Sequence, residues 1–144
     1  MSIRRALCSV LLTWTVAFVS PLVAQERLVL RVRLTTIPVE ATTAEGLTGF
    51  GSATAELDGD RLTVTGSFEG LRSRATSARL HAAPRGLRGP VIIDLDAISE
   101  TTGKISGDVR LTPVQADGLR RGHVYLQIQS EGAPDGNLRG WLLP

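Results

Sequence analysis

Apolar and polar side chains alternate with a period of two along most of the chain after residue 25. Every second residue of 28–34 is leucine or valine, and the alternate positions of residues 62–68 are again apolar or glycine. This period is typical of a β-strand with one face in a core. Because the turn sequence Asp58-Gly59-Asp60 precedes the second run, residues 50–70 are predicted to form a hairpin. Further strands are expected at 77–82, 90–98, 104–111, 123–130 and 137–143.

One segment departs from this period. Thr112 is suited to cap a helix and Pro113 to occupy its first position, so one short helical turn is predicted, ending near Gly118 or Gly122. Residues 36–47 lack periodicity and are predicted to form a long surface loop. The remaining connections are rich in residues that preset turn dihedrals: Pro84-Arg85-Gly86, Thr101-Thr102-Gly103 and Ala133-Pro134-Asp135-Gly136.

Short strands separated by glycine and proline turns predict an all-β fold. The expected architecture is an antiparallel Greek-key sandwich or barrel of about eight strands with one short helical turn. A chain of 144 residues with 42% hydrophobic and 21% charged residues corresponds to one globular domain.

The first 24 residues have the order of regions found in a secretory signal peptide. Arg4 and Arg5 precede an apolar run over residues 6–19, and Ala24 is a suitable small residue before a cleavage point. We therefore expect cleavage between Ala24 and Gln25, which leaves a domain of residues 25–144 in a secreted or periplasmic location. The apolar run is shorter than the roughly 20 residues that cross a bilayer, so no transmembrane segment is expected after cleavage.

Cleavage would change the charge of the molecule. The full chain holds 16 Lys and Arg against 14 Asp and Glu; the predicted signal takes two of the bases and no acid, which leaves 14 of each. It also takes the single cysteine, Cys8, so neither a disulfide nor a thiol nucleophile is expected. A neutral domain with few aromatic residues is not expected to bind nucleic acid.

Small, apolar and aromatic residues recur in a characteristic order along the chain. The order includes Gly51-x-Ala-x-Ala-x-Leu57, Ala78-x-Leu80-His81, Gly89-Pro90-Val91, Tyr125 and Gly136-Asn137-Leu138-Arg139-Gly140. Over about residues 28–143 it resembles the chordin-type (CHRD) domain. The resemblance implies an extracellular immunoglobulin-like β-fold, found in animal chordin, a growth-factor antagonist, and in secreted bacterial proteins. We therefore expect an exported, non-enzymatic binding or scaffold domain without a cofactor.

The resemblance also raises an alternative, a copper or zinc protein of dismutase type. Members of the family often carry His-x-His where this chain has Arg79-Leu80-His81, and a further histidine where it has Gln129. Only His81 and His123 remain as histidine ligands, and a protein metal site usually needs three or four ligands. No metal is therefore expected, and His81 is expected to be a hydrogen-bonded imidazole at the end of a strand.

Basic residues gather around His81, with no acid between Glu69 and Asp94. This excess favours an anionic partner, either an unidentified protein or an envelope or extracellular component such as acidic polysaccharide or lipid headgroups. Tyr125 and Trp141 are expected to pack or to form a stacking platform, and Arg139 to pair with an acid or to contact an anion. The candidate ligand-binding residues are His81, Arg79, Arg85, Arg88, Tyr125 and Arg139.

Overall fold

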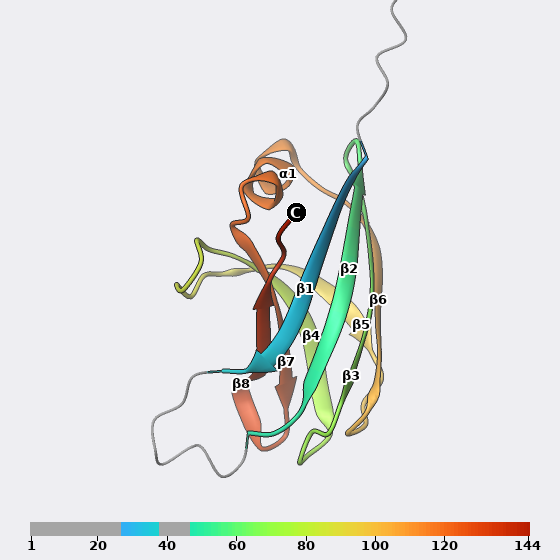
Figure 1. The fold of residues 1–144 in the computed structure, drawn as a ribbon, viewed down its shortest axis with the longest axis vertical. Helices are drawn as coiled ribbons and strands as arrows, with labels where there is room; N and C mark the ends of the chain where they lie inside the picture. The colour runs from blue at the N-terminus through green and yellow to red at the C-terminus, as the bar shows by residue number, and fades with distance from the viewer. Residues whose placement is uncertain (1–26, 38–46) are drawn as a thin grey trace, which may run out of the picture.

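Eight antiparallel strands close into a single barrel with one short helix, which confirms the predicted all-β class (Figure 1). The structure is a computed structural model and describes residues 27–37 and 47–144. The elements are β1 (Leu28–Thr36), β2 (Phe50–Asp58), β3 (Arg61–Glu69), β4 (Ala75–Ala82), β5 (Val91–Ala97), β6 (Gly103–Arg110), α1 (Pro113–Arg120), β7 (Val124–Ser130) and β8 (Ala133–Trp141).

The order of strands around the barrel differs from their order in the chain. The order is β1-β2-β3-β6-β5-β4-β7-β8, and pairing between β1 and β8 closes the barrel. Because β3 pairs with β6 and not with β4, the chain crosses to the other side of the barrel after the hairpin of β2 and β3. The crossover places β4 between β5 and β7, so that the loop after β4 lies near the beginning of β7.

The alternating apolar positions face the interior, as the period of two predicts. On β1, Leu30, Val32 and Leu34 are buried, while the intervening arginines are exposed. On β7 the alternation of burial is lost, because Tyr125 and Gln127 point outward and are nevertheless buried. The outer face of β7 is therefore covered by another part of the chain.

The predicted helical turn is confirmed as α1, which lies at one end of the barrel (Figure 1). The hydroxyl of Thr112 accepts a hydrogen bond from the backbone N–H of Gln115, and the side-chain oxygen of Gln115 accepts one from the N–H of Thr112. This reciprocal cap satisfies two N–H groups that the helix leaves without partners. Of the two predicted stops, Gly118 lies inside the helix, and Gly122 follows its end with a φ of +70°.

The last predicted turn is wrong in position. The segment Ala133-Pro134-Asp135-Gly136 belongs to β8, and the turn is at Glu131 and Gly132, where the N–H of Gly132 donates to Ser73 Oγ. Pairing is irregular between Ser130↔Ala133 and Ile128↔Leu138, so the extra residues form a bulge. Pro134 is accommodated there because a bulged residue needs no ladder hydrogen bond.

Several predictions fall outside the described residues. They include the signal peptide over residues 1–24, its cleavage between Ala24 and Gln25, and most of the predicted loop over residues 36–47. Of that loop, Thr36 ends β1 and Ile37 is buried. Within residues 27–37 and 47–144, no helix has the length and apolar character needed to cross a membrane.

Gly140 permits the approach of β1 to β8. A Cβ atom at this position would overlap the carbonyl oxygen of Arg33 and Cγ2 of Val32, both in β1. A side chain at residue 140 would therefore force the two strands apart where the barrel closes.

We call the contact between β1 and β8 the seam of the barrel. We expect Gly140→Ala to lower the free energy of unfolding by about 1–3 kcal/mol, because the added methyl overpacks this seam. Gly118→Ala is the matched control, since a Cβ there meets nothing within 4 Å and alanine favours a helix by about 0.5–1 kcal/mol. Equilibrium urea unfolding measures both. Equal effects of the two substitutions would show that the seam does not depend on Gly140.

Candidate functional site

Three rings lie side by side on the outer face of β4, β7 and β8. His81 pairs with Tyr125, and Tyr125 pairs with Trp141, so the three residues form one row across the strands. The ring centroids of His81 and Tyr125 are 4.7 Å apart with planes 8° from parallel, and those of Tyr125 and Trp141 are 5.1 Å apart at 48°. Packing, the first of the two roles expected for Tyr125, is thus confirmed by its complete burial.

The loop after β4 is fastened to this row of rings through Gly89 and Ala83. The carbonyl oxygen of Gly89 accepts a hydrogen bond from His81 Nδ1 at 3.0 Å, and the Gly89 N–H donates to the hydroxyl of Tyr125 at 3.3 Å. The indole of Trp141 donates to the carbonyl oxygen of Ala83 at 3.2 Å. These contacts confirm His81 as a hydrogen-bonded imidazole.

The close approach of this loop requires glycine at position 89. A Cβ atom there would overlap the carbonyl oxygen of Ala82, the last residue of β4. The loop therefore folds back onto the barrel, and Arg85 and Arg88 are carried on a segment whose two ends are fixed.

Arg139 lies over the same rings. Its guanidinium carbon is 4.8 Å from the centre of the Tyr125 ring, and its Nε and a terminal nitrogen donate to Gln127 Oε1 at 3.0 and 2.6 Å. Gln127 in turn donates to the carbonyl oxygen of Asp135. Among the described residues, the expected pairing of Arg139 with an acid is not found, and the neutral amide of Gln127 orients the guanidinium instead.

Burial lowers the pKa of Arg139, and the nearby positive charge of Arg88 lowers it further, against an opposing effect of Tyr125. The normal pKa of a guanidinium lies so far above neutrality that the group remains charged. Part of this charge is therefore held away from water with a second cation nearby, an arrangement that an incoming anion would stabilise.

A pocket of about 460 Å³ lies between β1, β8 and the loop after β4. Four of its lining residues are arginines, and no described residue of the lining is acidic. None of the ion pairs among the described residues involves Arg31, Arg33 or Arg85. The lining consists of Arg31, Arg33, Thr35, Thr36, Arg85, Gly86, Arg139, Gly140, Trp141 and Leu143.

The family model of the CHRD domain matches residues 30–142. The chain belongs to the CHRD domain family. No curated protein and no solved structure matches it. Two of the motifs that carry the resemblance help to build the pocket. Gly89 holds the loop after β4 against His81, and Arg139 and Gly140 line the pocket itself.

The predicted arginine cluster of this CHRD domain is divided by the fold. Arg85 and Arg139 reach the pocket. Arg79 instead pairs with Asp94, with 2.8 Å between Nε and Oδ1. Arg88 is outside the lining and acts on it through its charge.

The described residues of this CHRD domain do not fit the alternative hypothesis, a copper or zinc centre. His81 is buried and its Nε2 has no hydrogen-bond partner among the described residues, whereas His123 is exposed just before β7. In the described part of the chain, no group of three or more His, Cys, Asp or Glu side chains is arranged to hold a metal ion. Position 129, where the resemblance suggests a histidine, holds a glutamine bonded to Ser77.

Sequence reasoning missed the contribution of β1 to the pocket. Arg31, Arg33 and Thr35 stand at the polar positions of an alternating strand, where solvent-facing side chains are expected. The one signal that points to them is Gly140, because a glycine inside a strand often marks the close approach of another backbone.

We expect Tyr125→Phe to keep the stacked rings and remove the hydroxyl that contacts Gly89. The hydroxyl accepts a hydrogen bond from the Gly89 N–H and donates one to the Gly89 carbonyl oxygen, so the free energy of unfolding should fall by about 1–2 kcal/mol, and the amide of Gly89 should exchange its hydrogen faster. Native-state hydrogen exchange measures the second effect. Unchanged exchange at Gly89 would show that the Tyr125 hydroxyl does not anchor the loop.

Proposed function

We propose that this CHRD domain is an exported, non-enzymatic binding module that holds an anionic group of an extracellular or envelope partner in the arginine pocket. The proposal rests on one observation: four arginine side chains from β1, β8 and the loop after β4 line a single concavity without a described acid among them. The positive charges of these arginines repel one another. A bound anion would attract each of them and so offset the repulsion.

The chemistry of the lining suits an oxyanion. Guanidinium groups donate paired hydrogen bonds to a carboxylate, phosphate or sulfate. The hydroxyls of Thr35 and Thr36 supply further donors, and the half-buried ring of Trp141 supplies an apolar wall. Such a mixture of a few converging polar groups with an aromatic side chain is typical of a ligand site.

The same lining supports binding rather than catalysis. Its described members are Arg, Thr, Gly, Trp and Leu, and it contains no His, Asp, Glu or Cys side chain among the described residues. General acid–base catalysis depends on a group that gains and loses a proton close to the working pH. The nearest imidazole, His81, is stacked on Tyr125 and does not line the pocket.

The arginine pocket is tested by retention on an immobilised polyanion that contains no sugar, such as a polyglutamate resin, eluted with a NaCl gradient. We expect the double variant Arg33→Gln/Arg85→Gln to elute at clearly lower salt than the unmodified protein, with affinity reduced at least about tenfold by the loss of two charged donors. The effect should shrink as salt rises, since ions screen exposed charges.

The matched control is Arg61→Gln/Arg110→Gln, which removes the same net charge from arginines outside the pocket that pair with Asp108 and Asp60. This variant should elute close to the unmodified protein. If both double variants shift equally, the attraction depends on net charge and the pocket is not a site.

Export is tested separately by the mass of the mature protein isolated from its natural source. Because residues 1–24 have the order of regions of a signal peptide, the protein recovered outside the cytoplasm should begin at Gln25. Intact-mass measurement of that fraction checks this. Recovery of the full-length chain, from the cytoplasm alone, would contradict export and leave the pocket hypothesis unaffected.

A further inference from the structure

We propose that the anionic partner is a linear acidic polysaccharide that extends from the arginine pocket across the outer face of β1, β2 and β3. This inference rests on the proposed function and specifies its ligand class. The observation behind it is a second, shallow pocket of about 520 Å³ on that face, which shares Arg31 and Arg33 with the arginine pocket.

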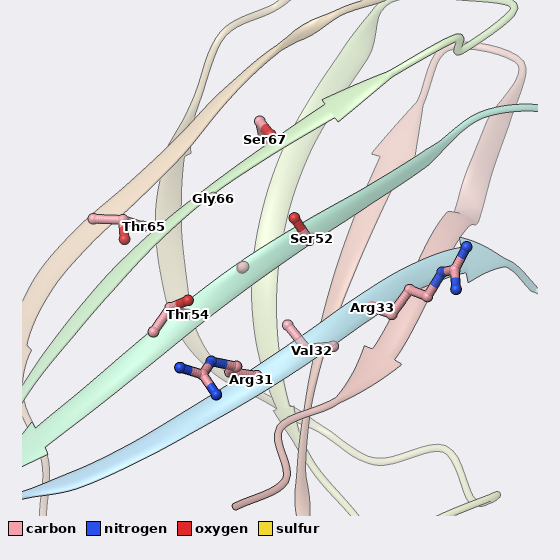
Figure 2. Close-up of a pocket in the computed structure, with 9 residues that line it drawn as sticks. Arg31, Val32, Arg33, Ser52, Thr54, Thr65, Gly66 and Ser67 are labelled. Atoms are coloured by element: carbon pink, nitrogen blue, oxygen red, sulfur yellow. The ribbon is translucent and has the colours of Figure 1, made fainter.

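The two pockets are continuous because Arg31 and Arg33 stand between them. Figure 2 shows both arginines on β1, with Ser52 and Thr54 beside them on β2. Further from β1, Thr65 and Ser67 of β3 complete the surface. We call this surface the hydroxyl face; it is lined by Arg31, Val32, Arg33, Ser52, Ala53, Thr54, Thr65, Gly66 and Ser67.

Strand register arranges the hydroxyl face in parallel rows. One row runs from Arg33 through Ser52 and Ser67 to Lys104, and its neighbour runs from Arg31 through Thr54 and Thr65 to Ser106. Neighbouring strands are about 4.8 Å apart, so a row of four residues spans roughly 14 Å. Each row is long enough to contact more than one sugar unit, and the first has a cation at each end.

The side chains in these rows match the groups of an acidic sugar polymer. Serine and threonine hydroxyls both donate and accept hydrogen bonds, as sugar hydroxyls do, while arginine and lysine bind the carboxylates or sulfates. In the lining of the arginine pocket, Trp141 offers a ring against which a sugar can pack. A single small anion held in the arginine pocket would reach neither of the polar rows on β2 and β3, whereas a longer polymer would contact both.

A lipid surface is the principal competitor, because Leu87 is exposed in the loop that carries Arg85 and Arg88. A membrane would engage that loop and one end of the pocket. It would not use the hydroxyls of β2 and β3, which lie on the far side of Arg31 and Arg33. The extent of the polar face therefore favours the polysaccharide.

The test compares oligosaccharides of polygalacturonate, a linear uronic acid polymer, by isothermal titration calorimetry. We expect the octasaccharide to bind at least about tenfold more tightly than the disaccharide, because only the longer chain reaches both pockets. The methyl ester of the octasaccharide has the same backbone without charge and should not bind detectably.

A variant of the hydroxyl face isolates the second pocket. Thr54→Val/Thr65→Val keeps β-branched side chains and removes two hydroxyls; we expect about a fivefold loss of affinity for the octasaccharide and no change for the disaccharide. Thr63→Val/Thr76→Val is the matched control, since neither residue lines either pocket, and it should bind like the unmodified protein.

The outcomes separate this inference from the proposed function. Equal affinities for the two oligosaccharides, or an unchanged octasaccharide affinity in Thr54→Val/Thr65→Val, would overturn the polysaccharide while retention on the polyanion resin still supports the pocket. Binding to phosphatidylglycerol vesicles that Leu87→Ser abolishes, without binding of the octasaccharide, would assign the anionic group to a lipid. If Arg33→Gln/Arg85→Gln is without effect on every probe, both proposals fail.

Discussion

The close approach of β1 to β8 at Gly140 is the contact on which both the barrel and the pocket depend. Seven of the eight strand pairings can form without it, but the sheet then has two edges and an open core. The same approach carries Arg31 and Arg33 to the side of Arg139 and Trp141. Closure of the fold and assembly of the cationic site are thus one structural event, and a substitution that opens the seam would disturb both.

A second packed layer outside the barrel determines how the arginines are presented. The rings of His81, Tyr125 and Trp141 cover the outer faces of three strands, and the loop after β4 is bonded to them through Gly89 and Ala83. Burying these rings supplies the free energy that holds the loop, because each removes a large apolar area from water. The loop in turn fixes the position of Arg85. Charges that would otherwise move apart in solvent are kept together by apolar packing beneath them.

The sequence predicted those features that depend on neighbours in the chain. The period of two located the strands, and Thr112 followed by Pro113 identified the start of the helix, since both are local patterns. Features that depend on which strands become neighbours were not predictable from periodicity. Arg31 and Arg139 are far apart in sequence and meet through barrel closure alone. Proline and glycine indicated a turn at residues 133–136, but a bulge inside β8 accommodates the backbone of these residues equally well.

At each position that the resemblance associates with histidine, this chain has a side chain that makes a structural contact. Position 79 holds a guanidinium, which at neutral pH has no lone pair for a metal, and it is paired with Asp94. Position 129 holds a glutamine that is already bonded to Ser77. Position 81 retains an imidazole, but its Nδ1 is bonded to the loop and its ring is stacked on Tyr125. Each position therefore has a structural contact that holds the layer or the loop in place. Among the described residues, Arg31, Arg33 and Arg85 of the pocket take part in no ion pair. An anion is the ligand that such a surface would stabilise most.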